Sequence, residues 1–437
     1  MTASEQLAQF AAGSKALPKL CREYKKERAT VHLKELVGGA LSFYAAAAVA
    51  KTGGVHIFVA EDRDAAAYLL NDFYNLLDEK QVYFFPSSYK RSAAYGAEDA
   101  QGVVQRTTAM NAVRGFTKGY LVVCTYPEAL AERVVDAATL QRDTIAVKLG
   151  DKISIAVLED ALADANFTRV DFVYEPGQYS VRGGIVDVFS YSESKPYRID
   201  FFGDEVDSIR RFNISSQLSA DKLDRVEIVP NLNAGEAPRV SFVQFAGSSA
   251  TCWFYDADYV LRRVNDLRRK VLADMEEPGQ IDRLLTSRNV LLRDMAGNSV
   301  VALRDNLPER PATAAVVFDT APQPKFNKNF EMLADDMIRN SLRGYATYIL
   351  SENKVQVERL ENIFHQIGRG QAAVRSLSVT LHEGFVDNDL KLCLYTDHQI
   401  FDRYQRYRIN GEIRRDEQMT VAELNQLRPG DYVVHID

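Results

Sequence analysis

The sequence is short of the residues that mark disulfide-rich and metal-binding proteins. Its cysteines are Cys21, Cys124, Cys252 and Cys393, and no two of them form a C-x-x-C pair. This spacing predicts buried, reduced thiols and a cytoplasmic protein rather than a disulfide framework. The six histidines are equally scattered, and His382-Glu383 lacks the second histidine that a zinc-protease helix needs. We therefore expect no metal site.

Long apolar segments are also missing. No stretch approaches the roughly 18 uninterrupted apolar residues of a membrane-spanning helix, since the alanine-rich run Tyr44–Ala50 ends at Lys51. The segment Met1–Gln6 lacks the basic start and apolar centre of a secretory signal. We expect no membrane partner. The net charge of −7 also weighs against binding nucleic acid over the whole surface, because phosphate contacts need a positive field.

A chain of 437 residues is too long for one hydrophobic core and suits several domains. Helical and strand patterns alternate over its first third, which predicts a parallel sheet covered by helices. The expected helices are Ser4–Ala12, Lys19–Thr30, Ser42–Lys51, Asp62–Asp78 and Ala100–Arg114. The expected strands are Val31–Leu33, Val55–Ala60, Val82–Phe85 and Tyr120–Thr125.

The run Tyr174–Phe212 says most about function. Short groups of β-formers alternate with turn residues, which predicts a compact β-meander. Arg182 and Arg198 fall where side chains tend to face water, so an unpaired guanidinium there could grip a partner's carboxylate, with Phe202 as an apolar anchor. The alternative is that both arginines pair with local carboxylates such as Glu205 or Asp187 and that Phe202 is a core residue.

This run resembles the interaction domain shared by the excision-repair protein UvrB and the transcription-repair coupling factors of the Mfd family. A first half of the shared pattern is matched by Gly177, Tyr179, Arg182, Gly183, Asp187 and Phe189. A second half is matched by Tyr197, Arg198, Asp200, Phe201, Phe202, Asp204, Glu205, Asp207, Ser208, Arg210 and Phe212. In both families the pattern marks the surface that binds UvrA. The resemblance therefore implies that Arg182, Arg198 and Phe202 bind UvrA.

The phosphate-loop position separates the two families. A working UvrB needs glycines that expose backbone N–H groups and a lysine that reaches the nucleotide phosphates. Here the stretch contains Glu35, Gly38, Gly39, Leu41 and Ser42, with leucine at the lysine position. We expect this degenerate loop not to bind ATP. The segment after Pro86 is also too short for the aromatic hairpin with which UvrB clamps damaged DNA.

The far end favours the coupling factors. Residues 427–435 resemble the first strand of their RNA-polymerase-interacting module, and we expect that module to continue beyond Asp437. Residues 384–401 resemble the end of the domain that precedes it. No Asp-Glu-x-His box and no second phosphate loop occur, whereas UvrB would show helicase motifs by this length. The chain is thus similar to the N-terminal part of an Mfd-family coupling factor.

The resemblance implies a multidomain α/β fold: a Rossmann-like, degenerate helicase-like parallel layer with an inserted β-rich domain and a further α/β domain. The expected parts are a first UvrB-like section (1–143), the inserted UvrA-binding domain (144–228), a second UvrB-like section (229–322), an α/β domain without an assigned role (323–412), and a linker helix with the start of the polymerase module (413–437).

The expected function is non-catalytic. The resemblance implies that this chain recruits UvrA to RNA polymerase stalled at a lesion, while the full-length parent releases polymerase by ATP-driven translocation. ATP and Mg²⁺ would then serve only the parent's motor domains, and this chain would need no cofactor. Polymerase would bind only through the module beyond residue 437, and DNA mainly through the motor. The alternative is a UvrB-type damage-binding ATPase, and nucleotide binding decides between the two.

Two local basic faces leave a choice open. Arginines and Lys270 cover one side of the expected helix Leu261–Leu272, and Arg403–Arg415 interleaves basic residues with tyrosines. Either face could contact nucleic acid or a partner. The alternatives are a solvated helix surface for the first and a linker surface for the second.

Overall fold

The computed structural model describes residues 2–89, 99–233, 237–275, 277–405 and 407–409. The predicted linker and module start at 413–437 lie outside the described residues. So do residues 90–98, in the segment where we expect UvrB's long hairpin to be missing. The chain divides into two compact units. One contains residues 1–143 and 231–410, and the other contains residues 144–230.

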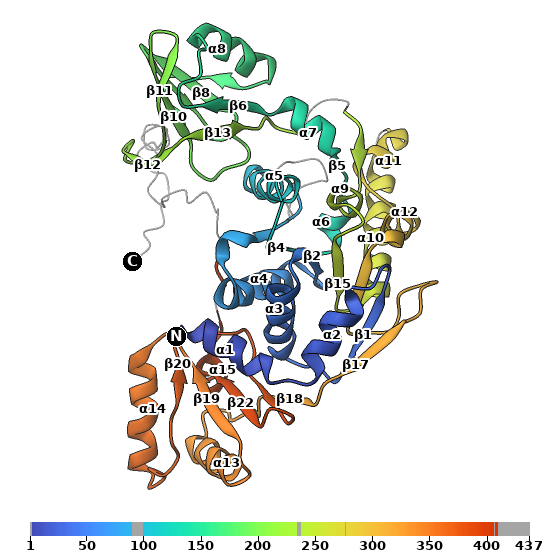
Figure 1. The fold of residues 1–437 in the computed structure, drawn as a ribbon, viewed down its shortest axis with the longest axis vertical. Coiled ribbons are helices and arrows are strands. Elements are labelled where there is room, and N and C mark those ends of the chain that lie inside the picture. The colour runs from blue at the N-terminus through green and yellow to red at the C-terminus, as the bar shows by residue number, and fades with distance from the viewer. Residues whose placement is uncertain (1, 90–98, 234–236, 276, 406, 410–437) are drawn as a thin grey trace, which may run out of the picture. The chain divides into compact units, whose positions relative to one another are not determined.

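A seven-stranded parallel sheet forms the centre of the first unit (Figure 1). In spatial order its strands are β17 (Ala314–Val317), β1 (Thr30–Lys34), β16 (Ser299–Ala302), β15 (Thr251–Phe254), β2 (Gly54–Val59), β4 (Tyr120–Thr125) and β3 (Val82–Phe84). The central strands β2, β15 and β4 are almost wholly buried, as expected for a parallel sheet covered by helices.

Helices pack against this sheet, and short elements join them. The longer helices are α1 (Ala3–Ala12), α2 (Ala16–Tyr24), α3 (Ala40–Thr52), α4 (Arg63–Leu76), α5 (Ala100–Arg114) and α10 (Ala257–Asp274). The shorter helices are α6 (Pro127–Ala131), α7 (Ala137–Asp143), α9 (Phe242–Ala246), α11 (Ile281–Leu284) and α12 (Arg288–Asp294). Three 3-10 turns, η1 (Glu79–Gln81), η2 (Pro278–Gln280) and η3 (Met295–Gly297), and the paired strands β5 (Val134–Val135) and β14 (Arg239–Val240) complete the layer.

The helix predicted over Lys19–Thr30 is wrong at its C-terminal end. Helix α2 stops at Tyr24, and Thr30 already belongs to β1. The segment between them turns, with Arg28 in the left-handed region at a φ of 52°. The mixed charges of this segment resemble an exposed helix face, but the chain must reverse here so that β1 can enter the sheet.

A five-stranded mixed sheet follows in the same unit. Its spatial order is β18 (Thr320–Pro322), β21 (Phe385–Asp387), β22 (Leu392–Thr396), β19 (Ala346–Leu350) and β20 (Ser376–Leu377). Its helices are α13 (Phe330–Leu342), α14 (Lys354–Gln366) and α15 (Asp397–Ile400). Apolar side chains of α13 and α14, including Leu333 and Phe364, pack with Tyr395 of β22 in one buried cluster.

The second unit is built around a six-stranded sheet. Its order is β12 (Ser219–Leu223), β11 (Glu205–Phe212), β10 (Tyr197–Phe202), β9 (Ile185–Val188), β8 (Gln178–Arg182) and β7 (Thr168–Arg169). Helix α8 (Ile155–Asp164) and the antiparallel pair of β6 (Ile145–Lys148) and β13 (Arg225–Ile228) complete it. Leu158 and Leu162 of α8 pack with Val186 and Ile199 of the sheet. Strands β8 to β11 form the β-meander predicted over Tyr174–Phe212.

The order of strands confirms the predicted fold class. β15, β16 and β17 follow residues 144–230 in sequence, yet they complete the sheet that β1–β4 begin. The β-rich unit is therefore inserted within the parallel α/β layer. Within the described part of the chain, no helix is both long enough and apolar enough to cross a membrane.

Candidate protein-binding surface and phosphate loop

One face of the six-stranded sheet gathers the three residues predicted to bind UvrA. The antiparallel register pairs Ser180 with Asp187, and Asp187 with Arg198. Directly paired residues share a face, and side chains two positions apart on a strand point the same way. Arg182 therefore lies on the face of Ser180, and Phe202 lies on the face of Arg198. The opposite face carries the apolar core.

Asp187 holds the two arginines together. Its carboxylate is 1% exposed and accepts two hydrogen bonds from Arg198, at 2.7 Å and 2.9 Å. Arg182 donates a third at 2.5 Å. Two guanidinium groups thus compensate one buried carboxylate, which makes the pairing part of the fold of this unit.

The pairing decides between the two expectations for the arginines. Both are bound to Asp187, as in the alternative of pairing with a local carboxylate, and neither guanidinium is unpaired. The two are not equivalent. The Arg198 side chain is 15% exposed and lies over Phe212, whereas that of Arg182 is 37% exposed. Arg182 is thus the more accessible of the two.

Phe202 is not a core residue. It ends β10 at the tip of the β10–β11 hairpin and is 83% exposed. The turn passes through Gly203 at a φ of 63°, a conformation that glycine adopts without strain. The preceding residue, Phe201, packs against the core of the unit. A large aromatic side chain held in water by a short hairpin is a typical anchor for a partner protein.

Two further apolar side chains flank the arginines, and sequence reasoning missed both. The Arg182 guanidinium lies 4.8 Å from the ring centre of Phe172, which is 48% exposed. Arg198 donates to the carbonyl of Gln217, and the next residue, Leu218, is 70% exposed. Only the tertiary fold brings these loops beside the arginines. The surface thus has exposed apolar groups around a basic centre.

The degenerate phosphate loop lies between β1 and α3 in the first unit. Three of its backbone N–H groups have partners within the chain: those of Ala40 and Leu41 donate to the carbonyls of Val37 and Gly38, and that of Val37 donates to the Thr320 hydroxyl. A phosphate-binding loop instead points these groups at the anion. Leu41 provides no charge for a phosphate.

The backbone of Glu383 and Gly384, in the same unit, packs against this loop. A Cβ added to Gly39 would lie 2.1 Å from the carbonyl oxygen of Glu383, and one added to Gly38 would lie 3.1 Å from that of Gly384. The backbone between β20 and β21 therefore packs directly against the two glycines of the loop.

Asp72 ties this contact to the helices. The Ser42 hydroxyl lies 2.7 Å from the Asp72 carboxylate and 3.0 Å from the Gly39 carbonyl. In a working loop that hydroxyl would face Mg²⁺. Asp72 also accepts the backbone N–H of His382 at 2.7 Å and lies 2.5 Å from its ring nitrogen Nδ1.

The pairing of His382 with Asp72 predicts a dependence of stability on pH. Burial lowers the pKa of His382, but the charge of Asp72 and the hydrogen bond to it raise that pKa by more, to about 8. A raised pKa means that the stabilisation is complete below about 6.5 and is lost as the pH rises through 8. We expect the first unit to lose about 2 kcal/mol between roughly pH 6 and pH 9.

Denaturant unfolding at pH 6, 7, 8 and 9 checks this expectation. His382→Gln keeps a polar side chain without the titration, so its stability should change much less over this range. Equal losses in the two proteins would assign the effect to other groups.

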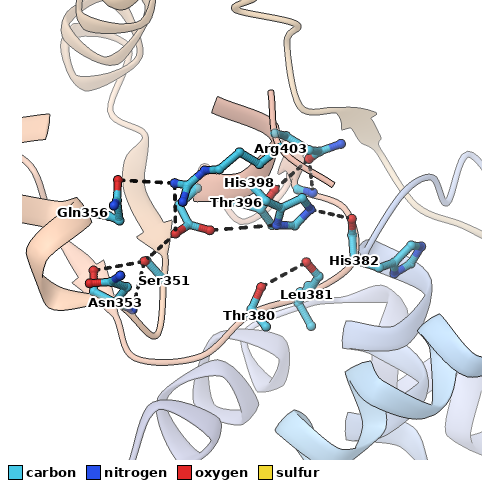
Figure 2. A network of polar contacts seen from close by, with 12 residues as sticks. Ser351, Asn353, Gln356, Thr380, Leu381, His382, Thr396, His398 and Arg403 are labelled. Atoms are coloured by element: carbon cyan, nitrogen blue, oxygen red, sulfur yellow. Dashed lines mark hydrogen bonds and ion pairs between the residues drawn. The ribbon is translucent and has the colours of Figure 1, made fainter. Parts of the chain in front are cut away.

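On the other side of His382, a polar network fixes the same segment (Figure 2). The His382 carbonyl lies 2.9 Å from Nε2 of His398, while the His382 ring points away from that histidine. Burial lowers the pKa of His398. Asp397 accepts the Ser351 hydroxyl at 2.7 Å and lies 4.0 Å from Arg403. The contact over the phosphate loop is thus held from two sides.

The two basic faces are occupied by local contacts. On α10, arginines pair with carboxylates of neighbouring elements, as in Arg263 with Glu128 at 2.6 Å and Arg268 with Asp282 at 2.5 Å. In the described part of 403–415, Arg408 pairs with Glu79 at 3.0 Å. These contacts favour the alternatives of a solvated helix and a packed linker. No group of three or more metal-ligating side chains gathers among the described residues.

Comparison with known proteins found one matching family model and several related proteins. Residues 145–233 match the family model of the UvrB interaction domain. The transcription-repair-coupling factors of Bacillus subtilis (strain 168) and Escherichia coli (strain K12) are each 27% identical to this chain over 199 residues, which cover 45% of it. That of Staphylococcus epidermidis (strain RP62A) is 21% identical over an alignment that covers 84% of this chain.

The relatives are much longer than the aligned region. It spans 17% of the B. subtilis and E. coli proteins and 38% of the S. epidermidis protein. The interaction domain at residues 145–233 and the alignment with coupling factors over 84% of the chain support the recognition of this chain as an N-terminal region of a transcription-repair coupling factor.

Proposed function

We propose that this chain is the non-catalytic part of a coupling factor that recruits UvrA. The surface that binds UvrA comprises Phe202, Arg182 and Arg198 on one face of the inserted unit. The observation that carries the proposal is Phe202, which is 83% exposed at a hairpin tip in a domain that matches the UvrB interaction domain. Phe172 and Leu218 extend this surface.

The division of labour in the parent protein follows from this proposal. The parent displaces RNA polymerase stalled at a lesion with an ATP-driven motor that lies outside this chain. ATP and Mg²⁺ serve that motor, and polymerase binds through the module beyond residue 437. The recruited UvrA then starts excision repair at the exposed lesion. This chain contributes no chemistry and needs no cofactor of its own.

Calorimetric titration of this chain with purified UvrA tests the proposal. A saturable heat with a single class of site is the expected result. The same heat should be measured when no nucleotide is added to this chain. A correctly folded chain that gives no heat and is not retained by immobilised UvrA would refute recruitment by this part of the parent.

A damage-binding ATPase of the UvrB type is the competing function. Two observations on the loop argue against it: the N–H groups of Ala40 and Leu41 are bonded within the loop, and the Glu383 backbone packs against Gly39. A restored lysine would correct neither of these. The two functions therefore predict different responses to ATP.

We expect millimolar ATP with Mg²⁺ to leave the melting temperature unchanged in both the natural chain and Leu41→Lys. Ligand at 100 times its dissociation constant would add about 2.7 kcal/mol of stability, which a melting scan detects readily. An ATP-dependent rise in Leu41→Lys alone would show that only the lysine is missing. A rise in the natural chain would favour the ATPase.

A further inference from the structure

A cavity of about 600 Å³ lies at the amino edge of the seven-stranded sheet. Four neighbouring strands, in the spatial order β1, β16, β15 and β2, start there. The loops that lead into them border the cavity, with Arg28 before β1, Ser299 at the start of β16, Thr251 at the start of β15 and Gly54 at the start of β2. The degenerate phosphate loop follows β1 and lies at the opposite, carboxyl edge, so the two are separate places.

The lining is polar and built from small residues. Glycines and hydroxyl side chains make up most of it: Thr52, Gly53, Gly54, Ser248, Ser249, Thr251, Gly297 and Ser299. The hydroxyls of Thr52 and Ser299 donate to the carbonyls of Ala48 and Lys26. Those of Ser248 and Ser249 make no hydrogen bond with any residue that the structure describes, so they can donate to a ligand. The lining, which also includes Tyr24, presents more polar than apolar surface, so a polar or charged ligand fits it better than an apolar one.

The charged residues of the lining lie in the turn between α2 and β1, which we predicted to be helical. Lys25, Lys26 and Arg28 line the cavity, and Glu27 is the one acidic residue that the described lining contains. Lys26 is bound to Glu23. Lys25 and Arg28 are exposed and make no side-chain hydrogen bond or ion pair with any residue that the structure describes. The lining therefore contains two cations without a side-chain partner among the described residues, in a chain whose net charge is −7.

His56, a buried residue next to the lining residue Gly54, adds no charge of its own. Burial lowers the pKa of His56 to about 4, its hydrogen bond to Gly53 opposes that shift, and the charge of Lys25 adds to it. The His56 ring lies just under Gly54, since a Cβ on that glycine would be 3.9 Å from Nε2. With a ring that stays neutral at pH 7, the lysine and arginine supply the charge.

We propose that this cavity binds a phosphate-bearing anion through Lys25 and Arg28, with the hydroxyls of Ser248 and Ser249 as further donors. Guanidinium and ammonium groups bind phosphate through charge-assisted hydrogen bonds. The volume suits a group of mononucleotide size. The phosphate can belong to a small phosphorylated molecule or to the backbone of DNA, and the two sources are separable by experiment.

The test titrates the whole chain with inorganic diphosphate at low ionic strength, by calorimetry. We expect one saturable site, with affinity lowered about tenfold or more in Lys25→Ala/Arg28→Ala, because each substitution removes a charge-assisted contact. The control Lys354→Ala/Arg375→Ala removes the same charges from exposed positions outside the cavity and should bind as the natural chain does. Ser249→Asp, which places a carboxylate in the cavity, should abolish binding.

A second arm replaces diphosphate with a short DNA duplex. If the duplex binds with the same dependence on Lys25 and Arg28 and competes with diphosphate, the ligand is a nucleic-acid backbone. If only diphosphate binds, the ligand is a small phosphorylated molecule. Absence of binding by both probes overturns the proposal, and so does an equal loss of affinity in the control variant.

Discussion

We expect Phe202→Ala to weaken binding to UvrA by about 2–4 kcal/mol, which is roughly 30- to 900-fold in affinity. Among the described residues of the interaction domain, Phe202 is the most exposed large hydrophobic side chain, and an aromatic anchor at the centre of an interface often contributes that much. Stability should change by less than about 0.5 kcal/mol, because the ring packs against little of its own chain. Calorimetric titration and a melting curve of the same preparation give both values.

Val157→Ala is the matched control. Val157 is also an exposed apolar residue of the interaction domain, 56% accessible, but it lies on α8 rather than on the arginine face. Its affinity for UvrA should stay within about twofold of the natural value, a difference below roughly 0.5 kcal/mol. Equal losses in the two variants, or none in Phe202→Ala, would remove Phe202 from the contact.

The second large effect concerns stability. Arg198→Ala should cost the interaction domain about 2–4 kcal/mol, since it removes two of the three arginine hydrogen bonds to a carboxylate that is 1% exposed. Arg182→Ala should cost only about 1 kcal/mol, because its side chain is 37% exposed and Arg198 stays in place. Denaturant unfolding followed by circular dichroism measures both.

This ranking affects how UvrA-binding data are interpreted. A loss of affinity in Arg198→Ala can come from a disturbed sheet, whereas a loss in Arg182→Ala reports mainly on the contact. Arg262→Ala, which removes an exposed ion pair with Asp258 on α10, is the stability control and should cost under about 1 kcal/mol. If Arg198→Ala unfolds like the control, the Asp187 pairing does not stabilise the domain.

The strands of the interaction domain could be predicted because short groups of β-formers alternate with turn residues along residues 174–212. The same alternation could not decide between Glu205 and Asp187 as partners of the arginines, because that choice depends on which strands pair and in which register. The structure selects Asp187 and places Glu205 opposite Phe202 in the hairpin. Exposure of Phe202 likewise depends on the hairpin tip rather than on residue type.

The packing around the phosphate loop could not be predicted from the loop's own residues. Leu41 predicts a failed nucleotide site, but the contact with Glu383 joins residues more than 340 positions apart, and no local pattern contains it. Gly39 and Gly384 were the available signals, since both sit where a side chain would meet neighbouring atoms. The cavity at the amino edge of the sheet could not be predicted for a similar reason. The pattern of Lys25–Arg28 predicts a continuation of helix α2, and no turn that could border a cavity.

Hydrogen–deuterium exchange of this chain with and without UvrA tests the central claim most directly. The account predicts that UvrA slows exchange in the β10–β11 hairpin around Phe202 and in the loops that carry Phe172 and Leu218. Exchange in the first unit, including Lys25–Arg28 and α13, should stay unchanged. Protection confined to the first unit, with none in residues 197–205, would contradict the assignment of the UvrA surface to the inserted domain.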